Sequence, residues 1–465
     1  MRLQRPRLDS LAQQVYGERF PSRISIRIAQ VSDTIFALAS GAGLCAVSVI
    51  RVSGPASDAA LSSLCGSLPA PRRASLRRIH HPRTRELLDQ CLVLRFPGPG
   101  SFTGEDGFEL HIHGGRAVAA GVLGALSLSD GLRLAEPGEF ARRAFLNGKL
   151  DLTEAEGLAD LIEATTSAQR DQALALAGGR LREQAQAWRG AILSLQAQAE
   201  AAIDFSDEGD VPADIWEGFS AALRGLRDQI MGALADGRRG EVLRNGFTVV
   251  LAGAPNAGKS SLMNALARRD VAIVSSIPGT TRDLIEVSFD LDGMPVILVD
   301  TAGLRDAGDE IEQEGIRRTM ARASAADLVL WLTALDQDDD AGVMVDAPVL
   351  RIETKSDLRS IESDPKRGLR LSARTGEGID VLLGLIAERA REAMRPEEPA
   401  LISRERHRIG LREACEALGR ITLGLPVEVA AEELRIAARA LAGIIGLVGP
   451  EDVLGEIFSR FCIGK

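Results

Sequence analysis

The first third of the chain alternates short apolar runs with clusters of glycine, proline and serine. Between residue 33 and about residue 148 the runs are Thr34–Ala39, Ala46–Val52, Cys91–Phe96 and Phe108–Ile112. Short apolar runs bounded by turn-forming residues are typical of strands. This region therefore predicts a strand-rich α+β domain.

A helical pattern begins near residue 150, where alanine, leucine, glutamine and glutamate dominate. Apolar positions recur there at alternating spacings of four and three, at Leu181, Ala185, Trp188, Ile192, Leu195, Ala199 and Ala202. This spacing puts them on one stripe of a long helix. Helical spacing returns near the C-terminus, at Leu411, Cys415, Leu418 and Leu425 and again at Leu434, Ala438, Leu441 and Ile445.

An alternation of strands and helices separates the two helical stretches. The apolar runs Thr248–Ala252, Pro295–Asp300 and Leu328–Leu332 are candidates for buried strands. Buried strands that alternate with helices indicate a doubly wound parallel sheet. We therefore predict a multidomain α/β chain, in which an α/β unit interrupts an all-α helical domain. Its parts are an extension expected to be disordered (1–30), the N-terminal α+β domain (31–148), the first helical part (149–245), the α/β unit (246–390) and the second helical part (391–465).

Composition narrows the class of protein. The 465 residues carry a formal net charge of −10, which argues against a sequence-blind polyanion binder. The longest uncharged runs contain Gly, Ser or Thr, so no membrane span is expected. Five scattered cysteines without CxxC pairs favour a reducing cytoplasm over a disulfide framework. For residues 1–30, an arginine-rich and acid-poor segment, a mitochondrial-type presequence is the alternative to a disordered extension.

Basic residues are distributed unevenly. An arginine cluster between residues 72 and 85 is interpreted as a solvated loop, although nucleic acid could engage it as a local patch. Only five of the 55 basic residues are lysines: Lys149, Lys259, Lys355, Lys366 and Lys465. Since arginine carries almost all the general surface charge, each lysine invites a specific explanation.

The segment Gly253–Ser261 reads GAPNAGKSS, a match to G-x-x-x-x-G-K-[ST] between an apolar run and a helical pattern. In such a loop successive backbone N–H groups face phosphate oxygens. We expect Lys259 to reach the β and γ phosphates and Ser260 to bind Mg²⁺. The nucleotide-binding positions are Asn256, Ala257, Gly258, Lys259, Ser260 and Ser261.

Two further segments complete a phosphate and magnesium site. Asp300, Thr301, Ala302 and Gly303 spell DTAG at the end of a buried strand, where an acid can hold Mg²⁺ through water. Gly279–Asp283 supplies Thr281 as the second expected Mg²⁺ ligand. The residue directly after the DTAG glycine often is a glutamine that positions water. Here that residue is Leu304, so another group must orient the attacking water.

Base recognition is expected at Thr354, Lys355 and Asp357. A carboxylate placed edge-on to guanine accepts from two donors that adenine lacks, and the lysine stem can cover the ring. Ser372, Ala373 and Arg374 would offer a backbone donor to the guanine oxygen. The usual motif begins with asparagine, so Thr354 loses an amide able to brace the phosphate loop, and we expect weaker nucleotide affinity.

These segments resemble a translation-factor-class, Ras-like P-loop GTPase domain. Beyond it, the whole chain from about residue 33 resembles the MnmE family of tRNA modification GTPases. The motifs that carry this resemblance are DTI at Asp33, IRVSGP at Ile50, SFTGED at Ser101, EPGEFARRAFLNGKLDLTEAE at Glu136, AAIDF at Ala201 and FCIGK at Phe461.

The resemblance implies sites that the residues alone do not reveal. A tetrahydrofolate derivative (5-formyl or 5,10-methylene) would contact Arg51, Glu109, Lys149 and Lys465, and Cys462 would take part in the modification chemistry. Potassium would be held by Asn256, Ser275, Ile277 and Thr280, with Glu312 orienting water. The resemblance also implies a homodimer, tRNA as substrate and a FAD-dependent, MnmG-like partner in a heterotetramer. The family's glycine-rich loop is altered at Ser40–Cys45, which leaves its contacts open.

Plain structural alternatives exist for several of these residues. Arg51 and Glu109 could form a surface ion pair, and Glu312 could belong to a solvated acidic face. Cys462 could be a small buried hydrophobe. His111 and His113 share one strand face, but no third metal ligand lies nearby.

The expected function is therefore GTP hydrolysis coupled, with the flavoprotein partner, to adding a carboxymethylaminomethyl-type group at C5 of the wobble uridine of certain tRNAs. The rival is a ribosome-assembly GTPase that acts as an RNA-binding switch. That rival would need an appended RNA-binding module and a basic surface, and neither is visible after residue 390.

Overall fold

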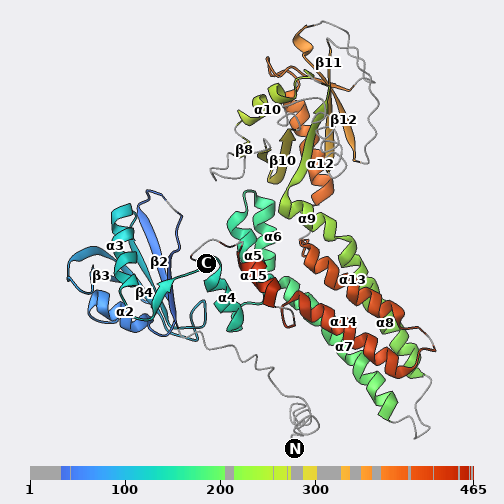
Figure 1. The fold of residues 1–465 in the computed structure, drawn as a ribbon. Helices are drawn as coiled ribbons and strands as arrows, with labels where there is room; N and C mark the ends of the chain where they lie inside the picture. The colour runs from blue at the N-terminus through green and yellow to red at the C-terminus, as the bar shows by residue number, and fades with distance from the viewer. Residues whose placement is uncertain are drawn as a thin grey trace, which may run out of the picture. The chain divides into compact units, whose positions relative to one another are not determined.

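The computed structural model describes residues 33–41, 43–204, 214–254, 256–269, 271–273, 286–300, 326–335, 347–358, 368–395, 400–422, 424–448, 451–459, 461 and 464. The chain divides into two compact units (Figure 1). One unit comprises Met1–Leu150 with Asp452–Lys465, and the other comprises Asp151–Glu451. The expected extension over residues 1–30 lies outside the described residues. No helix in the described ranges is long and apolar enough to cross a membrane.

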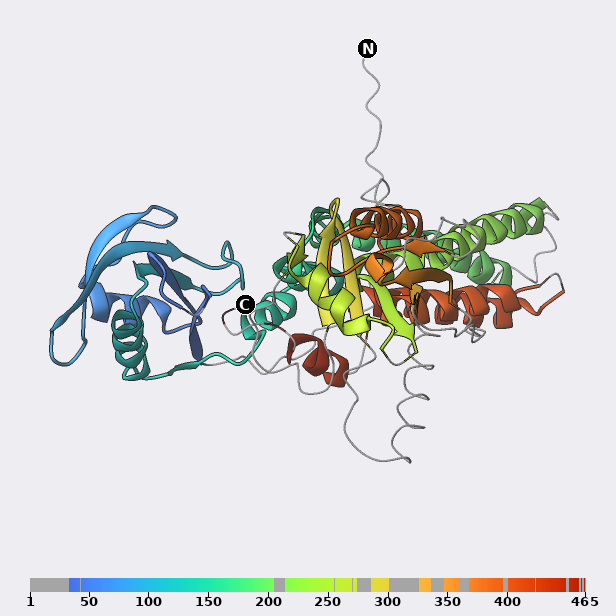
Figure 2. The same cartoon turned by 90° about the horizontal axis from the view of Figure 1, so that it is seen from above.

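The first unit is built on a six-stranded sheet with the order β3-β4-β5-β2-β1-β6. The strands are β1 (Thr34–Leu38), β2 (Val47–Ser53), β3 (Ser75–His80), β4 (Leu87–Phe96), β5 (Gly107–His113) and β6 (Leu132–Leu134). Helices α2 (Ser57–Cys65) and α3 (Arg116–Ser127) pack on one face, around a core that includes Phe36, Phe108 and Leu126 (Figure 2, blue part). Each of the four apolar runs falls in a strand, as expected.

The arginine cluster of residues 72 to 85 differs from the expected solvated loop. Its centre forms β3, the edge strand of the sheet, and Ile79 of that strand is fully buried in the core. The loop interpretation missed this because Leu76 and Ile79 are the only large apolar residues between positions 72 and 85. Charged side chains on an edge strand oppose pairing with a further strand, which fits the arginines of β3.

The opposite face of the same sheet carries α4 (Glu139–Leu146) and the C-terminal segment. Phe140 of α4 packs with Ile35 and Ala37, which alternate with the core residue Phe36 along β1. The ring of Phe458, near the end of α15 (Glu451–Ser459), lies 6.2 Å from the ring of Phe145. A Cβ on Gly464 would come within 2.6 Å of the Leu38 carbonyl oxygen, so the chain end runs close against β1.

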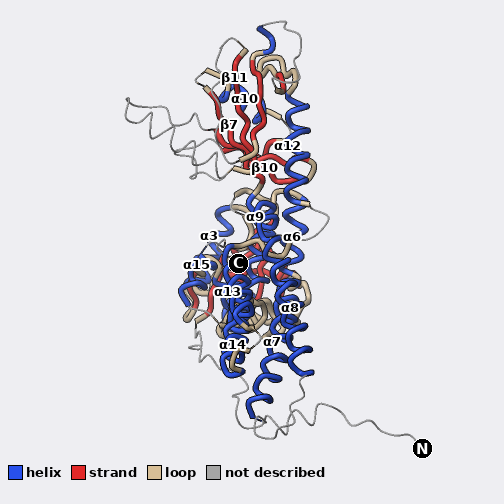
Figure 3. Tube along the Cα trace, turned by 90° about the vertical axis from the view of Figure 1, so that its right-hand side faces the viewer, coloured by secondary structure: helices blue, strands red, loops and turns tan. Residues whose placement is uncertain are grey.

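The helical part of the second unit consists of α5 (Leu152–Glu163), α6 (Ser167–Ala177), α7 (Arg180–Asp204), α8 (Asp214–Ala235), α9 (Gly237–Asn245), α13 (Glu405–Arg420) and α14 (Val427–Ile444). Helices α7, α8, α13 and α14 run side by side around one core, so the two stretches on either side of the α/β unit close into a single bundle (Figure 3). The predicted stripe is buried along α7 from Leu181 to Ala199, and its last position, Ala202, is half-buried. A capping box starts α5, where the Asp151 side chain accepts from the Glu154 N–H.

The α/β part holds a seven-stranded sheet with the order β13-β12-β11-β7-β10-β9-β8. Its strands are β7 (Phe247–Gly253), β8 (Ala272–Ile273), β9 (Glu286–Leu291), β10 (Met294–Asp300), β11 (Leu328–Ala334), β12 (Val349–Thr354) and β13 (Leu369–Arg370). Helices α10 (Lys259–Ala267) and α12 (Ile379–Met394) share one core against a face of this sheet. Every strand candidate from the sequence is confirmed.

One feature of this sheet departs from the all-parallel prediction. Strands β13, β12, β11, β7 and β10 are parallel, but β9 pairs with β10 in the antiparallel direction. Asp292 and Gly293 join β9 to β10 with positive φ angles of 53° and 84°. An Asp-Gly pair in this conformation makes a tight hairpin, which forces neighbouring strands to run in opposite directions.

Candidate nucleotide site and N-terminal pocket

The phosphate loop follows β7 and leads into α10. Gly253 has a φ of 140°, and a Cβ there would come within 2.2 Å of the Leu332 carbonyl oxygen, so only glycine fits. Gly258, with a φ of 92°, immediately precedes α10. The Lys259 ammonium donates to the carbonyl oxygens of Gly253 at 2.7 Å and Ala254 at 2.9 Å. The lysine is thus folded over the loop whose N–H groups would face phosphate.

The expected magnesium ligands begin with a hydroxyl and a carboxylate in contact. Ser260 Oγ lies 3.2 Å from Oδ2 of Asp300, whose side chain is buried at the end of β10. A hard oxygen donor beside a carboxylate suits Mg²⁺, which keeps several waters when bound to protein. The described part of this site therefore fits the metal.

The base-recognition residues come together at the ends of β12 and β13. Asp357, in the turn η3 (Ser356–Leu358), accepts at Oδ1 from the Ser372 hydroxyl at 2.7 Å. Its Oδ2 lies 3.8 Å from Nε of Arg374. The backbone N–H of Arg374 donates to Ser372 Oγ at 3.3 Å. Sequence reasoning gave Ser372–Arg374 a backbone role and missed the Ser372 hydroxyl, which holds the aspartate in place.

The structure corrects the expectation that Thr354 leaves the phosphate loop without a brace. Its hydroxyl donates to the carbonyl oxygen of Ala257 in the phosphate loop, at 2.7 Å. The brace that an asparagine amide would supply is therefore supplied by a shorter side chain. The stated reason for weaker nucleotide affinity, loss of that brace, is wrong, whereas the affinity itself stays a prediction.

Several predicted positions lie outside the described residues: Ser275, Ile277, Thr280, Thr281, Thr301, Ala302, Gly303, Leu304, Glu312, Cys462 and Lys465. Of the potassium ligands only Asn256 is described. It lies exposed on the phosphate loop, with a positive φ of 63°. Ser261 is exposed on α10.

A pocket of about 180 Å³ opens on the first unit, between β2, β5 and the loop from Gly98 to Asp106. Arg51 and Glu109 both line it, and Arg51 Nη2 lies 2.9 Å from Glu109 Oε1. The Arg51 guanidinium also lies over the ring of Phe102, 5.4 Å from its centroid. Lys149 does not line the pocket, but its ammonium donates to the Pro99 carbonyl oxygen at 3.0 Å. Two of the four predicted folate contacts, Arg51 and Glu109, thus form a half-buried ion pair in a pocket with aromatic walls, a contact that fits both the folate assignment and the plain ion-pair alternative.

Sequence reasoning missed the role of Arg143, which contacts acids of three motifs and is linked through Glu105 to Ser53 of this pocket. Arg143 is almost fully buried, and Nη2 lies 2.8 Å from Asp33 Oδ1 and 2.9 Å from Glu139 Oε1. Its Nη1 reaches Glu105, which in turn accepts from the Ser53 hydroxyl at 2.6 Å. Burial works to raise the pKa of Asp33, but hydrogen bonds from Arg133 and Arg143 outweigh it and hold the pKa low. Each of the three motifs contains at least one acid, but nothing in the sequence distinguishes Arg143 from the neighbouring Arg142.

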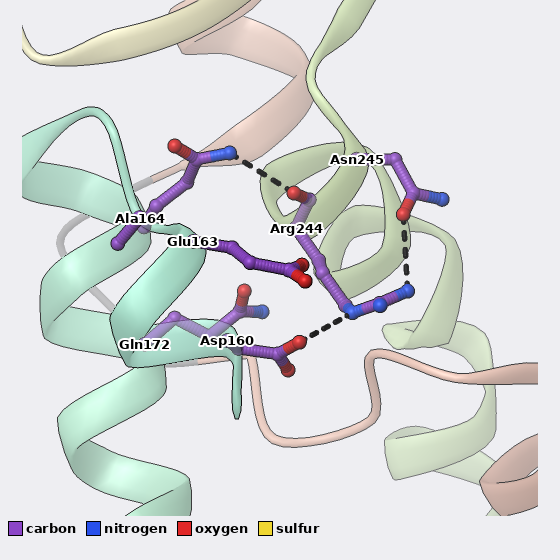
Figure 4. A pocket seen from close by; sticks show the side chains of 7 residues that line it. Asp160, Glu163, Ala164, Gln172, Arg244 and Asn245 are labelled. Atoms are coloured by element: carbon purple, nitrogen blue, oxygen red, sulfur yellow. Dashed lines mark hydrogen bonds and ion pairs between the residues drawn. The ribbon is translucent and has the colours of Figure 1, made fainter. Parts of the chain in front are cut away.

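A second pocket, of about 230 Å³, lies where the α/β part joins the helices (Figure 4). Asp160 Oδ1 accepts from Arg244 Nε at 2.9 Å and from Arg404 Nη2 at 2.7 Å. Gln172 Nε2 donates to the carbonyl oxygens of Gly240 and Ala400, at 3.1 and 2.8 Å. Asp160 and Gln172 therefore each contact both connections between the helices and the α/β part. One connection enters the α/β part after α9, and the other leaves it before α13.

Comparison with known proteins decides the family. The family model of the MnmE helical domain matches residues 152–462, and that of the GTP-binding protein TrmE N-terminus matches residues 34–149. The chain belongs to the MnmE family. A protein of Methylorubrum populi named tRNA modification GTPase MnmE is 56% identical over 93% of this chain and 98% of its own length. A protein of the same name from a Methylobacterium species is 54% identical over 94% of this chain and 100% of its own length.

The MnmE family resemblance stated from the motifs is therefore confirmed, as is the multidomain α/β class. Among solved structures, the G domain of the T. maritima FeoB iron transporter aligns with 31% of this chain at 25% identity and a TM-score of 0.23, which adds nothing to the argument.

Proposed function

We propose that the chain is a GTP hydrolase that, with a FAD-dependent partner, adds a carboxymethylaminomethyl-type group to C5 of the wobble uridine of certain tRNAs. The one-carbon unit would come from a tetrahydrofolate derivative. The observation that supports GTP binding most directly is the convergence of the phosphate loop, Asp300 and Asp357 at the carboxyl ends of the parallel strands. Ligands of open α/β sheets bind at that edge.

Binding of guanine would rest on Asp357. The Ser372 hydroxyl donates to one of its oxygens, so the carboxylate is oriented before the nucleotide arrives. An oriented acceptor can take the two hydrogen bonds that guanine offers and adenine does not. Lys259 and Ser260 would hold the phosphates and Mg²⁺, with Thr281, Asp300 and the DTAG residues completing that shell.

Hydrolysis would depend on groups other than Leu304, since its side chain cannot orient water. In the proposal Glu312 orients the attacking water, and Asn256 joins oxygens from Ser275, Ile277 and Thr280 in holding K⁺. The cation supplies positive charge where negative charge develops on the phosphates. This arrangement would close when the G domains of two copies meet in a homodimer.

The folate would bind at the pocket of Arg51 and Glu109, with Lys149 and Lys465 completing the site. Two features support this assignment. The pocket offers aromatic walls and an oriented ion pair, which suit a flat, hydrogen-bonding ring. In addition Gly464 lies against β1, next to the strand that carries Arg51, so the FCIGK segment with Cys462 would reach this sheet.

The MnmG-like partner, its FAD, the heterotetramer, tRNA and the cytoplasmic location remain proposals from family membership.

Monovalent cations provide the test of the hydrolytic arrangement. GTP turnover should rise steeply with K⁺ and little with Na⁺ or Cs⁺, and Asn256→Ala should abolish the K⁺ response. Asn264, exposed on α10, offers the matched control, and Asn264→Ala should keep that response. Glu312→Ala should lower turnover by roughly 10² to 10³ with GTP binding intact, the scale of one lost transition-state contact. Turnover that ignores the cation, or that survives Glu312→Ala, rules the arrangement out.

A further inference from the structure

We infer that Arg72 is the residue that binds the anionic tail of the ligand in the N-terminal pocket, an inference that rests on the proposed folate function. Arg72 lines the same pocket as Arg51 and Glu109. Its guanidinium lies over the Phe96 ring, 5.9 Å from the centroid, and donates to the Gly100 carbonyl oxygen. Both Phe96 and Gly100 line the pocket as well.

Charge at the pocket points to Arg72 and not to Arg51. The charged lining residues are Arg51, Arg72 and Glu109, a balance of two cations to one anion. Arg51 is already paired with Glu109 at 2.9 Å. Among the described residues no carboxylate lies within ion-pair distance of Arg72. The surplus positive charge of the pocket is therefore that of Arg72.

The size of the pocket and the burial of its lining give the same answer. Its volume of about 180 Å³ is smaller than the roughly 300–1,000 Å³ of sites that enclose a drug-sized ligand, so part of a folate would extend over the rim. Two polar lining residues, Ser53 and Thr103, are buried and hydrogen-bonded to each other at 2.6 Å, so they belong to the enclosed part of the lining. Arg72 is exposed, which places its guanidinium at the open end.

The backbone holds Arg72 in an unusual conformation. Its φ is 56°, in the left-handed region that residues other than glycine rarely adopt. The Arg72 N–H donates to the Arg95 carbonyl oxygen at 2.8 Å, at the end of β4, and this bond sustains the conformation. The result is a guanidinium turned back over Phe96, the next residue after Arg95. Such local strain gathers at ligand sites.

Lys149 is a further cation near the pocket and one of the predicted folate contacts. Its ammonium donates to the Pro99 carbonyl oxygen and it does not line the pocket. Lys149 would therefore complete the site by holding the loop at Pro99 in place, while Arg72 faces the ligand.

Calorimetry on the full chain tests this with two ligands, 5-formyltetrahydrofolate and its glutamate dimethyl ester, which keeps the ring and removes the tail charges. The parent should bind the acid about tenfold more tightly than the ester, the scale of a partly exposed, charge-assisted contact. Arg72→Gln should bind both ligands with the parent's affinity for the ester. Arg72→Lys should retain part of the preference, since it keeps the charge. Arg73→Gln is the matched control, because Arg73 is exposed, adjacent and outside the pocket lining.

The outcomes separate the two proposals. If the parent binds neither ligand, the folate assignment falls and the role of Arg72 falls with it. If the parent prefers the acid but Arg72→Gln keeps the preference, or weakens acid and ester equally, only the role of Arg72 is overturned.

Discussion

Hydroxyl groups fix the geometry of the nucleotide site at the scale of single residues. Thr354 braces the phosphate loop at Ala257, Ser260 meets Asp300, and Ser372 orients Asp357. Each is a short side chain with few rotamers, so each contact costs little conformational entropy. The hydroxyls that arrange the site are therefore distinct from the Asp357 carboxylate that would bind the guanine edge.

Thr354 offers a direct test of this account. Thr354→Val keeps the shape and removes the donor, which leaves the buried Ala257 carbonyl without its hydroxyl partner at a cost of about 1–3 kcal/mol. GTP affinity should fall by roughly tenfold or more, by titration with a fluorescent GTP analogue. Thr354→Asn should bind GTP at least as tightly as the parent, because an amide can make the same brace. An unchanged affinity in Thr354→Val would show that the brace is not needed.

A buried charge network in the helical bundle makes stability depend on pH. His407 is fully buried and its Nε2 lies 2.9 Å from Glu156 Oε2, beside Arg404 and Arg406. Burial lowers the pKa of His407, although Glu156 counteracts it. Burial would raise the pKa of Glu156, but His407, Arg406 and Arg404 hold it well below its usual range. Both groups therefore bind protons more readily in the unfolded chain.

The sign of the pH effect follows from that difference. A state that binds more protons gains stability as pH falls, and here that state is the unfolded one. Stability should thus be full above about pH 6.5, the ordinary pKa of histidine, and should decline below it, with Glu156 adding to the loss below about pH 4.3. Urea unfolding of the parent and His407→Gln between pH 5 and 8 measures this, at about 1.4 kcal/mol per pH unit for one proton. Equal pH slopes in the two proteins would contradict the assignment.

At the scale of elements, the β9–β10 hairpin is the main departure from the sequence prediction. The apolar run of β10 was recognised, but β9 mixes Glu286, Ser288 and Asp290 with apolar residues and lacks a buried-strand signature. The Asp292–Gly293 pair was the signal that could have revealed it. By contrast, the parallel strands β7, β10 and β11 are buried on both faces and read as continuous apolar runs.

Gly293 also connects this hairpin to α6. The Ala168 N–H donates to the Gly293 carbonyl oxygen at 3.2 Å, and a Cβ on Gly293 would come within 2.4 Å of Ser167 Oγ. Gly293→Ala should therefore lower the free energy of unfolding by about 1–2 kcal/mol, from its left-handed φ of 84° together with the contact.

The control for Gly293 lies in the same part of the chain. Gly384 is exposed on α12 with open space around its Cα, so Gly384→Ala should stabilise by about 0.5–1 kcal/mol. Thermal unfolding of both variants against the parent makes the comparison. A Gly293→Ala protein as stable as the parent would show that the hairpin tip can move away from α6.

At the scale of the whole molecule, changes in residue composition and in apolar spacing along the sequence predicted the order of the α+β, helical and α/β regions. The helical stripe of α7 and the spacing in α13 and α14 predicted a bundle interrupted by an α/β unit, because buried positions repeat with the period of a helix. The contacts that join the parts were not predictable. Asp160 and Gln172 contact segments far away in sequence, at Arg404 and Ala400, and no local pattern marks such pairs.

The candidate site likewise has some residues whose roles the sequence could predict and others whose roles it could not. The phosphate loop, Asp300 and Asp357 could be placed from motifs because a backbone loop and a carboxylate at a strand end have few arrangements. The parts played by Arg72 and Arg143 needed the fold, since both act through strands and loops distant in sequence.

The central claim, GTP hydrolysis coupled to modification of the wobble uridine, is tested most directly in tRNA itself. Nucleosides from digested total tRNA would be measured by mass spectrometry in a strain that lacks the gene, and again after the parent or Asp357→Asn is supplied. The account predicts that C5-modified wobble uridine is lost in the deletion strain, restored by the parent and not restored by Asp357→Asn, which places a donor where guanine needs an acceptor. An unchanged content of that nucleoside in the deletion strain would contradict it.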